Sequence, residues 1–179
     1  AEPLLLKQGS FIASIGERAR NIQLSNIKLL LPDVTLAANV KMFTKPNDWR
    51  LMIDGKASKL DMRKLYRYWP LALAPQSRES VMAMVKSGHA EQASLALNIT
   101  KAMYDANAFP DESVTSKMLA RDLTVEYLPG FPILKQANGT VYFIGGGMRV
   151  ELDSGTLLSG TTVKKSLLTA DNLLHPRAP

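Results

Sequence analysis

The chain has no cysteine and only two histidines, and these shortages exclude several classes of function. Without cysteine there are no disulfide bonds and no thiolate ligands for a metal ion. Neither His89 nor His175 has a cysteine, aspartate or glutamate at the spacing of a zinc site. The sequence therefore predicts no metal site and no metal cofactor.

Residues arranged for catalysis are also lacking. Ser154 stands between Asp153 and Gly155, as in a tight turn, and no histidine is placed in the sequence to activate it. The glycines at 145–147 are not followed by the lysine and the serine or threonine that a phosphate-binding loop requires. They are better explained as a hairpin turn. We expect a protein that is not an enzyme, with no catalytic residues and no cofactor.

Long hydrophobic runs are absent as well. Short runs such as those at 29–31 and 71–74 fall far below the roughly 18 to 20 apolar residues of a membrane-spanning helix. The 179 residues are nevertheless 46% hydrophobic, which is ordinary for a globular protein. The apolar residues must therefore be used in short, patterned segments.

That pattern is an alternation of apolar and polar residues, which is typical of strands with one apolar and one polar face. It is clearest at 34–43 and 90–100, and it leaves open whether the strands close on themselves or form an open sheet. Between Ile22 and Leu31 the apolar phase shifts, which predicts a bulge or bend near Ser25 and Asn26. Strands are predicted at 21–31, 34–43, 49–57, 90–100, 118–128, 139–144, 148–152 and 156–168, with a loop or irregular strand at 101–116.

The period changes between Leu60 and Lys86, where it favours two short helices. Pro70 ends the first helix, Pro75 opens the second, and Gly88 is the expected cap at the end of the second. The chain then divides into an N-terminal β-meander at 1–58, a helical interlude at 59–88 and a C-terminal β-groove segment at 89–179. We interpret these together as one continuous fragment of a larger protein.

The phase of alternation within the strands also predicts one shared apolar surface. Its expected members come from both halves of the chain and would form an apolar groove if the sheet is open. They are Val34, Leu36, Val40, Leu95, Leu97, Ile99, Val125 and Tyr127.

The positive charge is concentrated between residues 41 and 67, where eight basic residues face three aspartates. Such a segment attracts phosphate, and Arg63 and Arg67, close to Trp69, are the candidates to meet a lipid headgroup. The alternatives are a merely solvated basic face and a core tryptophan that anchors a helix to the sheet. Nucleic acid is not an expected partner, because glycine-rich loops and a recognition-helix pattern are missing.

Several short motifs, in order, give the chain a resemblance to a known family. It resembles the large AsmA-like envelope proteins of Gram-negative bacteria, of the YhdP and TamB type, over roughly residues 60 to 170. The motifs are Tyr68-Trp69-Pro70, Pro75 with Arg78 and Gly88, Phe131-Pro132-Ile133, Asn138-Gly139-Thr140 and Asp153-Ser154-Gly155.

The resemblance implies a mainly β fold: a long, bent antiparallel sheet forming an open, taco-like apolar groove, with two short helices. It also implies an internal segment of a periplasmic bridge between inner and outer membranes, anchored to the inner membrane by parts absent here. Such a bridge would carry phospholipid by its acyl chains. An open sheet also favours self-association through its edge strands, unless other parts of a longer chain cover them.

Two other classes of function remain open at this stage. In the first, the chain is a structural or protein-binding β-module of a large envelope protein, whose helices cover the apolar face and leave no room for a ligand. In the second, it is an enzyme with an unrecognised site. Lipid bound to the purified protein would distinguish the groove from both.

Overall fold

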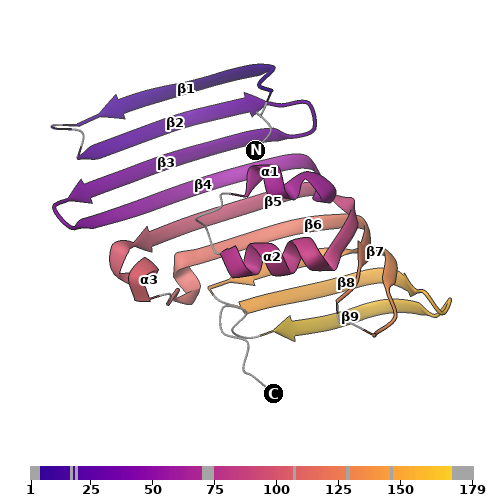
Figure 1. Cartoon of the computed structure of the whole chain (residues 1–179). Coiled ribbons are helices and arrows are strands. Elements are labelled where there is room, and N and C mark those ends of the chain that lie inside the picture. Colours follow the sequence, from indigo (N-terminus) through magenta and orange to yellow (C-terminus); the bar gives the residue numbers. More distant parts are fainter. Residues whose placement is uncertain are drawn as a thin grey trace.

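The computed structural model describes residues 5–16, 18, 20–69, 75–106, 108–127, 130–145 and 147–170. Nine strands form one antiparallel sheet in which each strand pairs with the next along the chain (Figure 1). The sheet is open, because β1 and β9 are its two edges and do not pair with each other. The strands are β1 (Gln8–Ile15), β2 (Asn21–Leu30), β3 (Thr35–Lys45), β4 (Asp48–Asp61), β5 (Val85–Thr100), β6 (Val114–Val125), β7 (Leu134–Ile144), β8 (Gly147–Leu157) and β9 (Thr162–Ala170).

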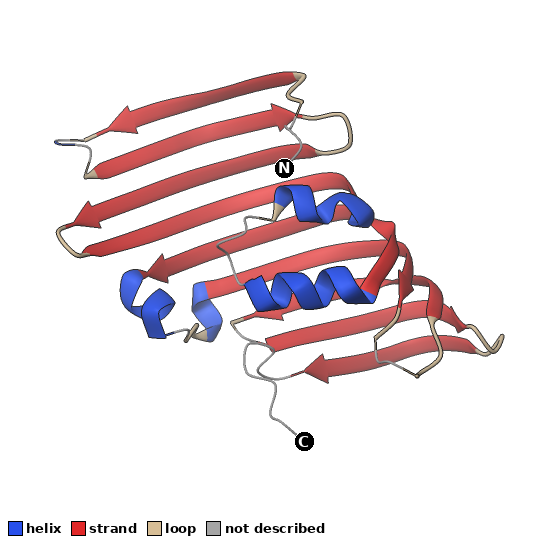
Figure 2. Cartoon of the chain, viewed as in Figure 1, coloured by secondary structure: helices blue, strands red, loops and turns tan. Residues whose placement is uncertain are grey.

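The few helices lie in the connections between strands. Between β4 and β5 lie η2 (Met62–Lys64), α1 (Leu65–Tyr68) and α2 (Pro75–Met84), and between β5 and β6 lie α3 (Lys101–Ala106) and η3 (Asp111–Ser113). Figure 2 shows α1 and α2 in front of one face of the sheet. The prediction of a mainly antiparallel β fold with two short helices between Leu60 and Lys86 is confirmed.

Strand register assigns every paired residue to one of two faces, since directly opposite residues project from the same side of a sheet. Val40 lies opposite Leu24 on β2 and Ile53 on β4, whereas Lys41 lies opposite Gln23 and Met52. We call the side that carries Val40 the apolar face and the other side the polar face. Side chains of the apolar face include Phe11, Ala13, Ile15, Ile22, Leu24, Ile27, Leu29, Leu36, Val40, Met42, Leu51, Ile53, Ala57, Ala93, Leu95, Leu97, Ile99, Met118, Val125, Val141, Phe143, Val150, Leu152 and Leu168.

A bulge in β2 keeps its apolar residues on that face. The register with β3 shifts between Leu24 and Ile27, and Asn26 has a φ of 53°, in the left-handed region that asparagine tolerates. One extra residue moves the apolar positions from even to odd numbers without moving them to the other face. The predicted bulge near Ser25 and Asn26 is confirmed.

Residues with left-handed φ values also occur in four other strands, and the sheet bends where they lie. Lys59, Asp122, Gln136 and Lys165, in β4, β6, β7 and β9, have φ values of 62°, 51°, 51° and 47°. The register shifts beside Asp122 and Gln136, as expected for bulges, which increase local twist and curvature. Figure 1 shows the central strands curving at this end of the sheet.

The hydrophobic core lies on the apolar face at this bend. Leu60, Ala90, Ala120, Leu123 and Ala137 contribute from four strands. The turn after β2 adds Leu31 and Val34, η2 adds Met62, and Leu65 and Tyr68 of the helical segment pack against the cluster. The helical connection therefore covers one end of the apolar face.

Several local predictions were wrong. Asp153, Ser154 and Gly155 lie inside β8 and form no tight turn, and the strand predicted at 156–168 is divided by the turn between β8 and β9. Residues 8–15, for which no strand was predicted, form β1. All of its residues are exposed, so no buried face imposes a regular apolar pattern on this part of the sequence. The segment 101–116 contains α3, η3 and the start of β6 instead of a loop or irregular strand. Gly88 does not cap a helix: it lies inside β5 at a φ of 112°, where a Cβ atom would come within 2.6 Å of the Leu123 side chain.

A pair of glycines on the apolar face tests the packing between strands. A Cβ atom at Gly139 would lie 2.3 Å from the Glu151 carbonyl oxygen, whereas one at Gly55 would meet nothing closer than 3.8 Å. Gly139→Ala should lower the free energy of unfolding by about 1–3 kcal/mol, because the clash is with backbone and neighbouring strands must separate. Urea denaturation measures the loss. Gly55→Ala is the control and should be neutral or slightly stabilising; equal effects would contradict the register.

Candidate functional site

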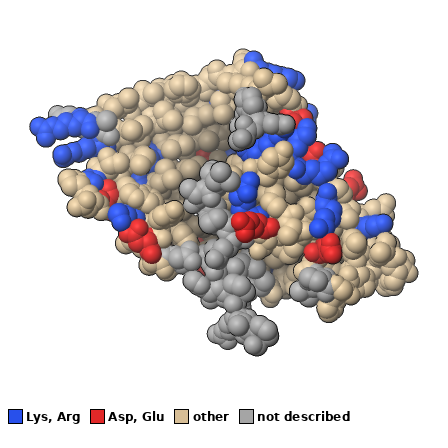
Figure 3. Space-filling view, viewed as in Figure 1, with Lys and Arg blue, Asp and Glu red and all other residues tan. Residues whose placement is uncertain are grey.

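The apolar face is a wide surface of uniform chemical character. At the paired strand positions of this face that the structure describes, no lysine, arginine, aspartate or glutamate occurs. Figure 3, viewed from the side of the helices, shows largely uncharged atoms over β1–β4, with Lys and Arg gathered toward the ends of these strands. A molecule with an apolar surface could therefore cross several strands without desolvating a charge.

The apolar face is buried by other parts of the chain at one end and left accessible at the other. At the bend it is closed by the core cluster, where Leu60 and Leu123 are buried. Along β3 the apolar-face residues are half-buried and the polar-face residues exposed, in strict alternation. At β1 the side chains of Phe11 and Ile15 are 62% and 67% exposed. The part of the face formed by β1–β3 is thus accessible to a ligand.

Most of the predicted groove residues do lie on the apolar face. The register places Leu36, Val40, Leu95, Leu97, Ile99 and Val125 there. Val34 precedes β3 and is buried in the core cluster, and Tyr127 lies beyond the end of β6 with its ring 6.1 Å from that of Phe131.

Not all of these residues are accessible, however. Leu97 and Ile99 are only 4% and 3% exposed, on the part of β5 next to α3. The accessible residues are instead those of β2 and β3, among them Ile22, Leu24 and Met42, which were not chosen as site residues. Their alternation was visible in the sequence, but the position of the helical cover was not.

The predicted headgroup residue Arg63 is already engaged. Its Nε donates to Oδ1 of Asp61 at 3.1 Å and its terminal nitrogen to Oδ2 at 2.8 Å, while its backbone N–H donates to the same carboxylate at the start of η2. The hydrogen bond from Arg63 lowers the pKa of Asp61 and, in return, raises that of Arg63. The Arg63 side chain remains 67% exposed, so solvent reaches the pair.

The other two headgroup candidates lie on α1 and at its end. Arg67 donates from Nε to the Tyr66 hydroxyl at 3.2 Å, and its guanidinium carbon lies 5.9 Å from the centre of the Tyr66 ring. Trp69 caps α1, with its backbone N–H donating to the Leu65 carbonyl at 3.1 Å. A phosphate that reached Arg63 would compete with Asp61 for it.

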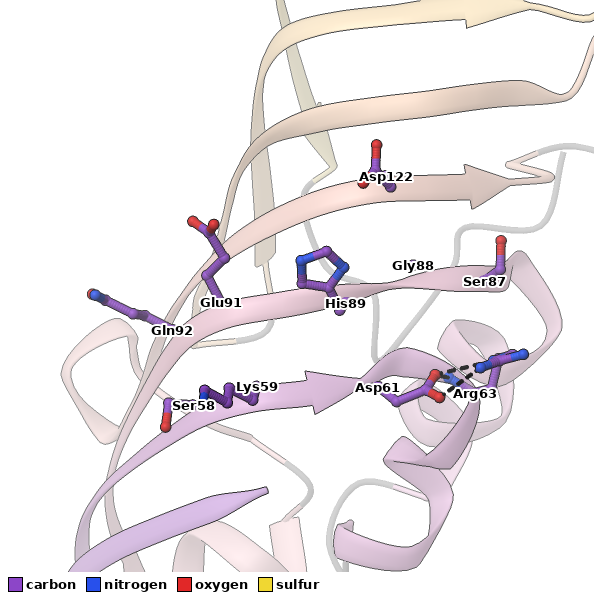
Figure 4. Close-up of a pocket in the computed structure, with 10 residues that line it drawn as sticks. All are labelled: Ser58, Lys59, Asp61, Arg63, Ser87, Gly88, His89, Glu91, Gln92 and Asp122. Atoms are coloured by element: carbon purple, nitrogen blue, oxygen red, sulfur yellow. Dashed lines mark hydrogen bonds and ion pairs between the residues drawn. The ribbon is translucent and has the colours of Figure 1, made fainter. Parts of the chain in front are cut away.

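A hollow on the opposite side of the sheet is the other candidate site. It has a volume of about 930 Å³ and lies along the bend, lined by Ser58, Lys59, Asp61, Arg63, His89 and Glu91 among others (Figure 4). Basic and acidic groups are mixed there, and Arg121 forms an ion pair with Glu91 at 3.3 Å. Within the described chain, no group of three or more histidine, aspartate or glutamate side chains is placed to hold a metal ion. The described lining of the hollow therefore gives no reason to propose a metal site there.

Comparison with other proteins identified no relative from which a function could be inferred. Family models, curated proteins and solved structures gave no match to the chain. Among the helices that the structure describes, none has the length and apolar character needed to cross a membrane.

The Asp61–Arg63 pair predicts a small pH dependence of stability. Because the folded-state pKa of Asp61 is lowered, its contribution is present above the ordinary aspartate pKa and is lost as the pH falls through the folded value. Asp61→Asn keeps a capping oxygen but removes the charge. The variant should be less stable than the wild type near pH 7, by less than about 1 kcal/mol for so exposed a pair.

This difference should disappear in acid, where the wild-type carboxylate is protonated. Urea denaturation of both proteins between pH 7 and pH 2 measures it. A difference that stays constant over the whole range would show that the charge of Asp61 contributes nothing.

Proposed function

We propose that this chain is a segment of a bridge-like protein that binds phospholipid by its acyl chains on the apolar face and conducts it between inner and outer membranes. The observation that carries the proposal is the charge-free apolar face, continuous over nine strands and accessible at β1–β3. With strands about 4.8 Å apart, this face is about 38 Å wide.

The physical role of such a face is to replace water around an acyl chain. Exposure of a methylene to water costs about 0.8 kcal/mol, so a chain of about 16 carbons faces a barrier on the order of 10 kcal/mol. The accessible part of the apolar face, at β1–β3, would lower that barrier along the section of the path that it lines. No bond is made or broken, so the proposed activity needs neither a catalytic residue nor a cofactor.

The polar headgroup would stay in water at the rim of the face. Arg67 lies on the helical segment that covers the bend, and Arg63 lies at the start of that segment with its side chain bonded to Asp61 on the polar side. In this proposal both meet the phosphate at the rim, where the two faces join. Trp69 would lie at the boundary between the two environments, as amphipathic aromatics do at membrane interfaces. The partners in this proposal are acyl chains and, through the rest of a longer periplasmic protein, the two membranes.

A second function is favoured by a different observation. The core cluster, with Met62, Leu65 and Tyr68 packed over the bend, closes part of the apolar face. A structural or protein-binding β-module would use the remaining face to dock a protein instead of a lipid. The two functions differ in what the purified protein contains.

Mass spectrometry of organic extracts from the purified protein separates them. We expect phospholipid to co-purify with the wild-type chain. Val40→Asp places a charge in the middle of the accessible face and should reduce the bound lipid at least about tenfold, since a charge cannot be buried against an acyl chain without a large desolvation cost.

Ala37→Asp is the matched control on the polar face of the same strand. An aspartate there lies opposite Lys28 and Lys56, which tolerate its charge, and this variant should retain its lipid. Circular dichroism and urea denaturation establish that both variants fold. Absence of lipid from the wild type, or equal loss in the two variants, would contradict lipid binding on this face.

The headgroup role has its own test. Reversing both charges with Arg63→Glu and Arg67→Glu should weaken binding to vesicles that contain phosphatidylglycerol, and the effect should shrink as salt screens the attraction. Lys41→Glu with Lys56→Glu makes the same change in net charge on the polar face and serves as control. Vesicle sedimentation at low salt measures both; if the two double variants bind alike, the headgroup role is wrong.

A further inference from the structure

The two edges of the open sheet differ in how well they are protected. Edge strands present unpaired backbone groups, and proteins usually block them with charges, proline or bulges. β9 carries Lys164 and Lys165, and Lys165 has the left-handed φ of a bulge residue. In β1 the sequence from Gln8 to Ile15 has neither a charge nor a proline.

β1 also exposes large apolar side chains on both faces. All of its residues are exposed, with Phe11 at 62% and Ile15 at 67% on the apolar face and Ile12 at 59% on the polar face. The N–H of Gly16 donates to the Asn21 carbonyl at 2.8 Å, and pairing alternates along an antiparallel ladder. The backbone groups of Phe11, Ala13 and Ile15 therefore point away from β2.

We propose that β1 is a docking edge for a second copy of this chain, which pairs antiparallel to it through its own β1. Self-pairing brings no like charges together, because the strand carries none, whereas pairing through β9 would oppose lysines. A two-fold axis at right angles to the sheet keeps the apolar faces of both copies on the same side. The dimer thus extends one continuous apolar face.

The side chains select a register for this pairing. With Ile12 opposite Ile12 of the partner, Phe11 lies opposite Ala13 and Gly9 opposite Ile15, so each large residue on the apolar face meets a small one. The outward-facing backbone groups of Phe11, Ala13 and Ile15 then form the hydrogen-bonded pairs. Ile12 and its copy form a non-hydrogen-bonded pair, in which side chains approach most closely.

Sedimentation equilibrium of the 179-residue chain tests the proposal. We expect a concentration-dependent dimer. Ile12→Lys sets two like charges directly opposite and should raise the dissociation constant at least about tenfold. Leu167→Lys is the matched control: Leu167 is a 61% exposed residue on the polar face of the other edge strand, and its substitution should leave the dimer intact.

Two further measurements identify the register. An equimolar mixture of Ile12→Lys and Ile12→Glu should restore association as a heterodimer, because opposite charges then face each other. Amide exchange of the wild type should slow at Phe11, Ala13 and Ile15 as concentration rises. A wild type that stays monomeric, a dimer disrupted by Leu167→Lys, or no recovery on mixing would overturn the proposal, which is independent of whether the apolar face binds lipid.

Discussion

Residues that lie directly opposite each other on neighbouring strands must project from the same face of a sheet, and this constraint organises the whole molecule. With nine strands in sequence order, one strand out of phase would place its apolar side chains in water. The bulge at Asn26 prevents this in β2, and Asp122 and Gln136 mark similar corrections in β6 and β7. The bulges therefore maintain the apolar face as well as bending the sheet.

The helical segment packs on the apolar face at the bend of the sheet. The face therefore has a covered part at the bend and an accessible part away from it. At the bend, small residues such as Ala90 and Ala120 are fully buried beneath η2 and α1, and this cluster supplies the stable core. Away from it, Leu24 and Val40 are only half-buried by their lateral neighbours. Stability is thus concentrated at one end, while the other end keeps apolar surface accessible.

The sequence predicted the strands and one bulge well because alternation is a local property. It failed where the outcome depended on distant contacts. Gly88 has the composition of a helix cap, yet it packs against Leu123 inside a strand. Leu97 follows the pattern of an accessible face but is buried next to α3, and Arg63 is held by Asp61, two residues away. The apolar face could be predicted; which part of it is covered could not.

The proposed function requires that lipid contact the apolar face of the sheet and not the polar face. Site-specific photocrosslinking compares Leu24 with Gln23, two half-buried neighbours on β2 that project from opposite faces. A photoreactive residue is placed at each position in turn, and lipid adducts are detected by mass spectrometry after irradiation with phospholipid vesicles. We expect adducts at position 24 and none at position 23. Equal labelling at both, or none at position 24, would contradict the account.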